Sequence, residues 1–422
     1  MTVERPLDPP ASIQVAVEVS NTLVSLRTSG LQRLATELIT HLDAEPDVDV
    51  TLLDGRSGQL RPLSSFDRRR LANHFNRQHQ KHSNASALTA RIGRRLRLEQ
   101  AERLPLTRPW LSSPRSTVGT PTWFIDLDGA WHSPLARNIL LPTLAGAETG
   151  PGDSGVQTAA LVPDLLPIEH PEWFPASSID RFRRWLEAHR DAGSDWLAIS
   201  NATALSLRNW LGDESTPVSV VRLGVDVGSD QKPKATEHAD AGGRSKSEGL
   251  SRQPLILMLG TVEPRKGHDL LLDALDLDGD GPAIDVVGSA GWADPSLITR
   301  LENHPRVRWH QSLNDQQIGE LWLRASLLIQ PTRGEGFGLP VAEALARGIP
   351  VFASRLEVLV ESGQGCAELV DTNAQAWADA LHRFSSDPTW PSELQRRTQA
   401  FVAHSWADSA ADIRSALQAR FG

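Results

Sequence analysis

The stretch RGEGFGLPVAEALARGIP, residues 333–350, sets two glutamates, Glu335 and Glu343, around a glycine-rich turn. Pro340 suits the start of a helix, Gly348 suits a left-handed helix end, and the residues between them are good helix formers. The preceding apolar run ASLLIQPT indicates a short buried strand. The unit is therefore predicted to be strand, glycine loop and helix. Such a loop points backbone N–H groups and the positive end of a helix dipole at one place, which suits an anion or hydroxyl groups. A structural turn with two solvated carboxylates is the alternative.

A second loop of the same design lies upstream, in LGTVEPRKGHDLLL at residues 259–272. A strand is predicted to end at Gly260, and a helix to begin near Gly267 and His268, with Arg265 and Lys266 between them. The carboxyl ends of parallel strands share one edge of the sheet, where such folds bind ligands. Two cations, free N–H groups and a helix N-terminus together predict a diphosphate site, with the two glutamates at opposite ends of a sugar nucleotide.

Length and composition restrict the class of protein. A chain of 422 residues has room for two domains. The apolar runs are shorter than the roughly 20 residues that span a bilayer, and the first twenty residues lack the apolar core of a signal peptide. One cysteine, Cys366, leaves no internal disulfide framework and favours a cytoplasmic setting. The net charge of −9 argues against general nucleic-acid binding.

Strand-like and helix-like runs alternate along the chain, which predicts an α/β protein with doubly wound parallel sheets. A strand-like run is expected at 158–166, among others. Residues 228–251 are almost devoid of apolar side chains and are predicted to form a disordered linker or loop. We expect an N-terminal acceptor-side domain at 1–227 with a basic insertion at 56–115, the linker at 228–251, a donor-binding domain at 252–395, and a final helical segment at 396–422.

At this point the sequence resembles the family 4 glycosyltransferases of the GT-B fold. EGFGLPVAE resembles their Glu-x7-Glu motif and GTVEPRKG their phosphate loop. SGLQRLATEL is similar to their N-terminal glycine loop and first helix. PDLLPIEHPEWF, LAISNATALSLRNWL, VRLGVD and SWADSAADI resemble further segments in the same order. The likeness covers most of the chain outside 55–120 and 228–250, and it is nearest to bacterial surface-polysaccharide transferases of the O-antigen type, many of them mannosyltransferases.

The resemblance implies two Rossmann-like domains facing each other across a cleft, with the last helix returning to the first domain. It also implies transfer of a hexose, with mannose from GDP-mannose as the expected case, to a growing or lipid-linked glycan. The implied transfer retains anomeric configuration and needs no metal or other cofactor. The residues implied to act in catalysis are Arg265, Lys266 and Glu335; those implied to bind the donor are Gly30, Gly260, Thr261, Gly336, Phe337, Gly338, Leu339 and Glu343.

Two positions depart from the family pattern. Thr261 stands where many relatives have an arginine, and Arg265 is expected to supply that charge. Pro163 precedes Asp164 where many relatives have a histidine before the aspartate, so only Asp164 is carried over, as a weak candidate.

Several other residues could be interpreted as metal ligands or as a reactive thiol, but a structural or solvated role is the stronger hypothesis for each. Asp126 and Asp128 have the spacing of a metal-binding acidic pair, but Arg265 and Lys266 already supply phosphate neutralisation. The histidines 74, 79 and 82 lie in a polar stretch without ligand partners at suitable spacing. Cys366 has no evident partner and is expected to be a small inert side chain.

The basic insertion at 56–115 holds 14 Arg or Lys against three acids. A solvated surface is the default interpretation of such a charge run. Its stretch 88–104 also places leucines along a cationic helix, so the alternative is peripheral contact with anionic lipid at the inner face of the plasma membrane.

Three functions remain open on the sequence: a glycosyltransferase in cell-surface polysaccharide synthesis such as that of lipopolysaccharide, a sugar-nucleotide epimerase of the same fold, and a non-catalytic sugar-nucleotide-binding protein. Acceptor use and release of nucleoside diphosphate would distinguish them.

Overall fold

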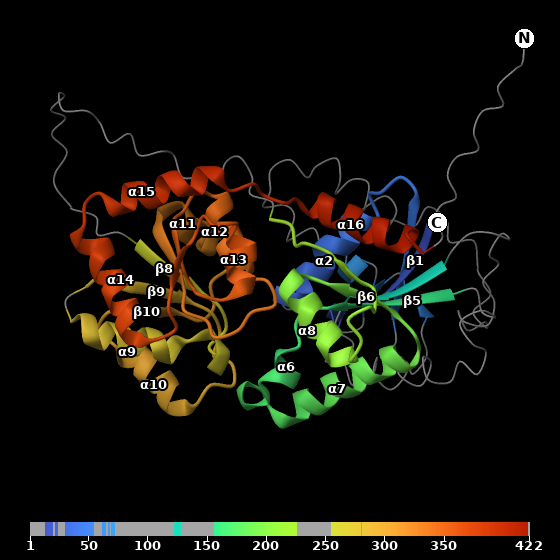
Figure 1. Cartoon of the computed structure of the whole chain (residues 1–422), viewed down its shortest axis with the longest axis horizontal. Coiled ribbons are helices and arrows are strands. Elements are labelled where there is room, and N and C mark those ends of the chain that lie inside the picture. Colours follow the sequence, from blue (N-terminus) through green and yellow to red (C-terminus); the bar gives the residue numbers. More distant parts are fainter. Residues whose placement is uncertain are drawn as a thin grey trace, which may run out of the picture.

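Two α/β units, each built on one sheet, lie side by side in the computed structural model (Figure 1). The structure describes residues 13–19, 22–23, 30–54, 61–64, 66–67, 69–71, 122–127, 156–225, 255–279 and 281–420. The stretch 88–104, the expected linker 228–251, Asp128 and the histidines 74, 79 and 82 lie outside these residues.

The N-terminal sheet has the strand order β3-β2-β1-β4-β5-β6-β7 in the described residues, and its neighbours pair in parallel except β2 with the short edge strand β3. Its strands are β1 (Ile13–Glu18), β2 (Val48–Asp54), β3 (Arg61–Pro62), β4 (Thr122–Asp126), β5 (Val156–Val162), β6 (Asp195–Ala198) and β7 (Val218–Val220). The helices of this unit are α2 (Gly30–Leu42), α6 (Leu166–Glu169), the 3-10 turn η3 (Pro171–Trp173), α7 (Ala176–Asp191) and α8 (Asn201–Leu211).

The C-terminal sheet is parallel throughout and has the order β10-β9-β8-β11-β12-β13. Its strands are β8 (Leu255–Leu259), β9 (Ile284–Val287), β10 (Val307–His310), β11 (Ala325–Gln330), β12 (Val351–Ser354) and β13 (Glu368–Val370). Its helical elements are η5 (Pro264–Lys266), α9 (His268–Asp278), α10 (Pro295–Asn303), α11 (Asp315–Arg324), α12 (Leu339–Ala346), α13 (Glu357–Gly363), α14 (Ala374–Ser386), α15 (Trp390–Arg397) and η6 (Thr398–Ala400), and α16 (Trp406–Gln418) follows them.

Both sheets reverse their strand order once, between β1 and β4 in the first and between β8 and β11 in the second. Ligands of open parallel sheets bind outside the carboxyl ends of the strands at such a reversal. In the C-terminal sheet the two predicted loops follow those two strands, so the topology itself brings them together.

One predicted boundary was wrong. The strand expected at 158–166 ends at Val162, because Pro163 has no N–H with which to continue the ladder. Asp164 therefore lies in the loop beyond the carboxyl end of β5, and α6 begins two residues later.

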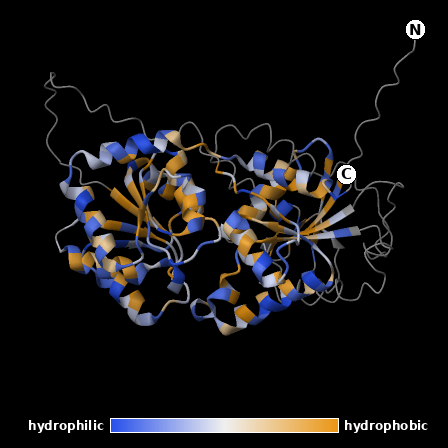
Figure 2. Cartoon of the chain, viewed as in Figure 1, coloured by the Kyte–Doolittle hydropathy of each residue, from blue (hydrophilic) through white to orange (hydrophobic). Residues whose placement is uncertain are grey.

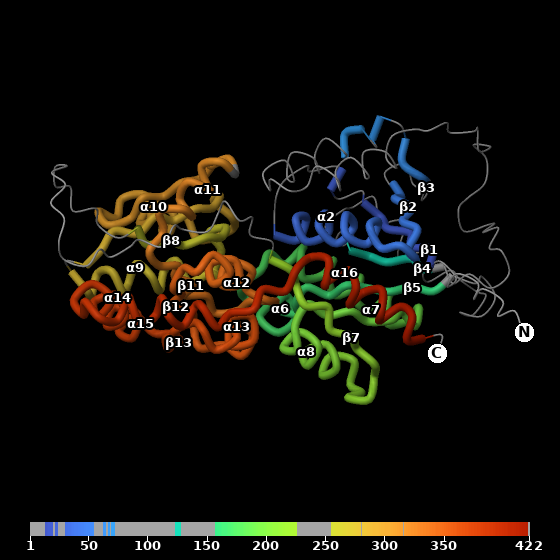
Figure 3. Tube along the Cα trace, turned by 90° about the horizontal axis from the view of Figure 1, so that it is seen from above, coloured from blue at the N-terminus to red at the C-terminus, as the bar shows by residue number. Residues whose placement is uncertain are grey.

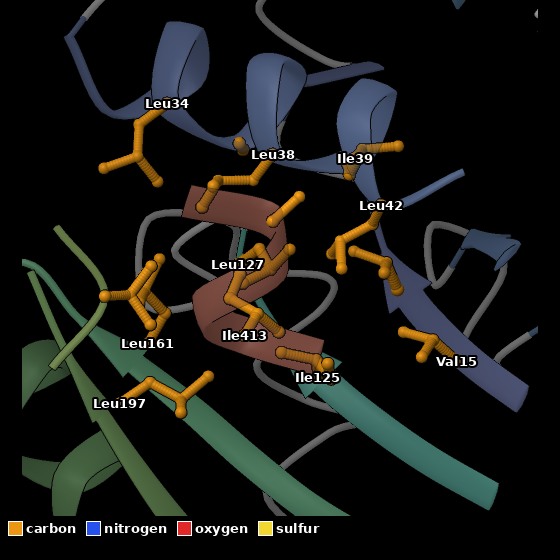
Figure 4. Close-up of a cluster of buried hydrophobic side chains, with 14 of the residues drawn as sticks. Val15, Leu34, Leu38, Ile39, Leu42, Ile125, Leu127, Leu161, Leu197 and Ile413 are labelled. Carbon is orange, nitrogen blue, oxygen red and sulfur yellow. The ribbon is translucent and has the colours of Figure 1, made fainter. Parts of the chain in front are cut away.

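The apolar faces of helices and strands meet in the interior of each unit, while the outward helix faces are mostly hydrophilic (Figure 2). One face of α2 is buried: Leu34, Leu38 and Leu42 are at most 2% exposed. Figure 4 shows them packed towards Ile125 and Leu161 of the sheet. No helix in the described part of the chain is long and apolar enough to cross a membrane.

The expected return of the last helix to the first unit is confirmed. The chain leaves η6 and runs back, so α16 lies along α2 rather than on the C-terminal unit (Figure 3). Trp406 and Ile413 of α16 are almost fully buried in the N-terminal core. The crossing is fixed by the amide of Val225, which donates to the carbonyl of His404 at 2.8 Å.

The two units also meet at the N-terminus of α8. Its first residues donate to the carboxylate of Glu361 on α13: Asn201 N lies 2.9 Å from Oε1 and 3.0 Å from Oε2, and Asn201 Nδ2 lies 2.8 Å from Oε1. The carboxylate satisfies amides that have no partner inside the helix and complements the positive end of the dipole. Glu361 thus acts as a cap supplied by the other domain.

We expect Glu361→Ala to weaken the contact between the domains without unfolding either. Loss of a helix cap costs about 0.5–2 kcal/mol. Small-angle X-ray scattering should give a larger radius of gyration than that of the wild type. Glu357→Ala, an exposed change on the same helix, is the control and should leave it unchanged. An unchanged radius in both variants would contradict a capping role across the boundary.

Candidate active site

The two predicted loops meet through one buried carboxylate. Lys266, at the end of η5 after β8, places its Nζ 2.7 Å from Oε1 and 2.9 Å from Oε2 of Glu335, which follows β11. Arg265 Nη1 donates to Glu335 Oε2 at 3.1 Å, and Gln330 Nε2 donates to Oε1 at 2.7 Å. The Glu335 side chain is only 6% exposed. The three side chains of Lys266, Arg265 and Glu335 thus form one cluster.

This cluster keeps Glu335 ionised. Burial alone would raise its pKa, but the cations of Lys266 and Arg265 and the hydrogen bonds outweigh burial and lower the pKa of Glu335 to about 2. A carboxylate offers about four acceptor positions, and four hydrogen bonds already reach this one. Its two oxygens are therefore occupied in this state.

Arg265 connects the cluster to its surroundings. Beyond Glu335, its Nη1 donates to the carbonyl of Gly334 at 3.0 Å, and its Nη2 lies 2.8 Å from Glu263 Oε1. Burial disfavours the charge, but the adjacent carboxylates Glu335 and Glu263 outweigh it and raise the pKa of Arg265. Its Nε, also buried, donates to no described residue. Two N–H groups of Arg265, on Nε and Nη2, and one proton of the Lys266 ammonium are thus left for a ligand.

Asp164 joins the site from the N-terminal domain. Its carboxylate accepts from the amide of Leu166 at 3.1 Å, and burial raises its pKa although Arg265 opposes the shift. The loop of Gly336 lies against it, and a Cβ at Gly336 would overlap the carbonyl of Pro163. Only glycine permits this approach of the two domains. Burial likewise raises the pKa of Glu263, so both carboxyls take up protons more readily than ordinary ones.

The start of α12 presents unused N–H groups. The amides of Gly336, Phe337, Gly338 and Leu339 donate to no described residue. Gly338 has a φ of 93°, and a side chain there would be strained and would clash with Leu359. The Phe337 side chain is packed into the N-terminal core, so this residue can offer a ligand only its backbone. These amides match the predicted anion site.

Glu343 lies one turn into α12, with its side chain 9% exposed, and it is paired across the domain boundary. Arg33 of α2 places its Nη1 2.5 Å from Glu343 Oε1. Gly30 starts the same helix α2, is exposed, and has nothing near its missing Cβ. No sequence pattern predicts Arg33 at this glutamate, because the contact joins segments from different domains.

Gly260 and Thr261 follow β8 and precede the turn that carries Lys266. Gly260 has a φ of 148°, and the aliphatic stem of Lys266 passes 3.6 Å from the place of a Cβ there. Thr261 is partly buried beside Gly291. Gly260 leaves room for the stem of Lys266, and neither residue offers a charge of its own.

Sequence reasoning missed Glu263, Gln330 and His268. Gln330 could have been predicted to face the site, because it is a polar side chain at the end of an apolar strand. His268 is fully buried, and burial and the charge of Lys266 lower its pKa to about 3, so it is neutral. Its two ring nitrogens have no partner among the described residues.

Of the acidic pair considered for metal binding, Asp126 has a structural role. Asp126 is buried and accepts from Trp185 Nε1 at 2.7 Å, with His189 Nε2 3.6 Å away. No group of three or more His, Cys, Asp or Glu in the described residues is arranged to hold a metal. Cys366 is buried and has a raised pKa because of that burial.

Residues 244–401 match the family model described as glycosyl transferases group 1. The match lies in the C-terminal unit, and the Lys266–Glu335 cluster lies inside it. The resemblance drawn from the sequence motifs is thereby confirmed.

Relatives of known name are similar over about half of this chain. The serotype-specific mannosyltransferase WbdA of Escherichia coli is 30% identical over 226 residues, which are 50% of this chain and 27% of that protein. The D-inositol 3-phosphate glycosyltransferase of Streptomyces griseus is 32% identical over 233 residues, 47% of this chain and 48% of the relative. The O-antigen chain mannosyltransferase B of Escherichia coli is 27% identical over 221 residues, which are 50% of this chain and 56% of the relative. The chain therefore spans little more than half, or less, of each relative.

Solved structures share the fold over nearly the whole chain. Anabaena HepE in complex with UDP and glucose superposes with a TM-score of 0.60 at 14% identity, covering 96% of this chain and all of that one. WaaG, a glycosyltransferase involved in lipopolysaccharide biosynthesis, gives a TM-score of 0.53 at 14% identity, covering 95% and 99%. The expected GT-B fold is confirmed.

The lowered pKa of Glu335 predicts a pH-dependent contribution to stability. Its folded pKa of about 2 lies below the ordinary 4.5, so the cluster stabilises the fold fully above pH 4.5 and loses that contribution as pH falls towards 2. Glu335→Gln should lower the free energy of unfolding at pH 7 by on the order of 3 kcal/mol. Urea unfolding should show this difference shrinking by pH 3. Glu302→Gln, an exposed change, is the control. A difference as large at pH 3 as at pH 7 would assign the loss to packing instead.

Proposed function

We propose that this chain is a glycosyltransferase that moves a hexose from a nucleoside-diphosphate sugar to a glycan in cell-surface polysaccharide synthesis. The observation that carries the proposal is the cluster of Lys266, Arg265 and Glu335 beside the unused amides of α12, at the strand reversal where ligands of this fold bind. The group 1 family match and the names of the relatives, several of them mannosyltransferases, support it.

The donor's diphosphate would lie against the N-terminus of α12. The free amides of Gly336–Leu339 and the helix dipole suit its negative charge. The free Nε–H of Arg265 and the remaining proton of Lys266 add charge-assisted donors from the facing loop. The ribose hydroxyls would donate to the Glu343 carboxylate. That carboxylate would then either bind Arg33 and the ribose together or release Arg33 when the ribose binds.

The chemistry asked of these groups is stabilisation of a leaving group. Cleavage of the bond between the anomeric carbon and the diphosphate oxygen builds negative charge on that oxygen, and fixed donors stabilise it. One such donor is worth roughly 3–4 kcal/mol in a transition state. As the diphosphate draws the Lys266 ammonium, the Glu335 oxygen that loses this bond gains an acceptor position for a hydroxyl of the sugar.

We further propose retention of anomeric configuration without a metal. Glu335 is fully hydrogen-bonded and held by two cations, which makes its carboxylate a poor covalent nucleophile. The acceptor hydroxyl would then attack the anomeric carbon from the face that the leaving diphosphate occupies, and its proton would pass to the departing diphosphate oxygen. Lys266 and Arg265 would neutralise the phosphates in place of a divalent ion.

The donor sugar is proposed to be mannose, carried as GDP-mannose, on the names of two relatives. HepE, which shares the fold, is described with UDP and glucose. The setting is proposed to be cytoplasmic, with residues 88–104 as the segment that contacts anionic lipid beside a lipid-linked acceptor.

A panel of nucleoside-diphosphate sugars tests the function. With a glycan acceptor, at least one sugar, GDP-mannose in the expected case, should yield nucleoside diphosphate and a lengthened glycan, in EDTA as well as without it. Lys266→Ala should lower turnover at least about a hundredfold, given the size of such electrostatic contributions. Product without a glycan acceptor, in the form of an altered sugar nucleotide, would indicate an epimerase; binding without turnover would indicate a non-catalytic protein. Activity lost in EDTA and restored by Mn²⁺ would refute the metal-free proposal.

The two glutamates should differ in calorimetry with free nucleoside diphosphate. Glu343→Ala removes the proposed ribose contact, and a hydrogen bond to a charged group contributes about 1.5–3 kcal/mol. We therefore expect at least tenfold weaker binding. Glu335→Ala should affect this affinity less and turnover more, because its proposed contact is with the sugar. The assignment fails if Glu335→Ala weakens nucleotide binding more than Glu343→Ala does.

A further inference from the structure

An exposed tryptophan reaches from the C-terminal domain to the N-terminal one. Trp292, in the loop between β9 and α10, is 44% exposed, the only tryptophan among the large apolar side chains exposed in the described residues. Its Nε1 donates to the backbone carbonyl of Trp173 at 2.7 Å. The indole N–H is thus satisfied by protein, and what remains for a ligand is the ring itself.

Three aromatic side chains of the N-terminal domain lie near this hydrogen bond, and one of them, Phe174, has its ring beside that of Trp292. His170 and Trp173 are stacked, with ring centroids 4.0 Å apart and planes 13° from parallel. Phe174 lies 6.1 Å from Trp292 between centroids. We call His170, Trp173, Phe174 and Trp292 the aromatic platform. In Figure 1 the neighbouring helices α6 and α10 lie at the lower edge of the domain boundary, away from the crossing that leads to α16.

The aromatic platform adjoins the catalytic cluster. Trp173 packs on Gly334, where a Cβ would come within 2.7 Å of its ring atom Cζ3. The carbonyl of Gly334 accepts from Arg265, and the next residue is Glu335. Trp173 therefore packs directly on the residue that precedes the proposed sugar-binding glutamate.

The surroundings of the rings indicate what they bind. Glu172 is exposed and lies 3.3 Å from His170 Nδ1, and Asp294, two residues after Trp292, is exposed and caps α10. Ser289, Ala290 and Gly291 before the tryptophan are small and exposed. Large continuous apolar patches mark sites for protein or lipid partners, whereas these rings are flanked by charged and small residues. Flat rings flanked by carboxylates suit a pyranose, whose C–H face packs on an aromatic ring while its hydroxyls donate to the carboxylates.

We propose that the aromatic platform binds a pyranose unit of the acceptor glycan and so holds the acceptor beside Glu335. The proposal rests on the function proposed above. The rings are already fixed by the contact of Trp292 with Trp173, so a sugar pays little ordering entropy on binding. Since the platform takes rings from both domains, it is complete only while the domains are together.

The test compares Trp292→Ala with Trp292→Phe in the full chain. Saturation-transfer NMR with trisaccharides of mannose, glucose, galactose and N-acetylglucosamine probes binding directly, and acceptor KM is measured with the saccharide that binds. Trp292→Ala should weaken saccharide binding and raise acceptor KM at least tenfold. Trp292→Phe keeps an aromatic face and should lose no more than about threefold. Nucleoside diphosphate affinity should stay within twofold in both variants. Leu323→Ala, an exposed apolar change on α11, is the control.

Each other outcome overturns the proposal. If none of the saccharides binds the wild type, or if Trp292→Ala binds them normally, the aromatic platform is not a sugar site. If Trp292→Phe is as damaging as Trp292→Ala, the N–H bond to Trp173 matters and the residue is a contact that closes the domains. Failure of the proposed function is seen separately, as a wild type that binds a trisaccharide but turns over no nucleotide sugar.

Discussion

The carboxylate of Glu335 is the interaction on which the site depends. It is buried, and burial of an unpaired charge is too costly for a folded protein. The cost is offset because Lys266 and Arg265 reach it from the neighbouring strand's loop and Gln330 from the end of its own strand. The same bonds hold the two loops at the strand reversal in one arrangement. Charge neutralisation and loop geometry are therefore a single property, and a change to any of these side chains alters both.

The second constraint is the close approach of the domains at Gly336. Its carbonyl accepts from Ser200 Oγ at 2.7 Å, and its missing side chain leaves space for the backbone of Pro163. This contact brings Asp164 to the cations of the other domain. The functional groups of the site thus come from both domains, and their electrostatics depends on how the domains are placed.

Much of this could be predicted from the sequence. The strand–loop–helix units and the positions of Lys266 and Glu335 on one sheet edge follow from local pattern. The return of helix α16 follows from the family resemblance. The pairing of Arg33 with Glu343, the contact of Trp292 with Trp173 and the filling of all the acceptor positions of Glu335 do not. They depend on distances between segments far apart in the chain, which neither periodicity nor spacing encodes. Pro163 carried a local signal that was overlooked, since it ends β5 and moves Asp164 into the loop.

The return of α16 has a consequence for the order of events during synthesis. Trp406, Ile413 and Leu417 complete the core that begins with β1 and α2. When the first domain has left the ribosome, that core still lacks this helix, and apolar surface on α2 is uncovered. The second domain draws its core from its own strands and helices, so it can close before the first one is finished. The domain translated first is therefore the one whose core is completed last. A nascent chain stalled before residue 406 would expose the apolar face of α2, to which chaperones can bind.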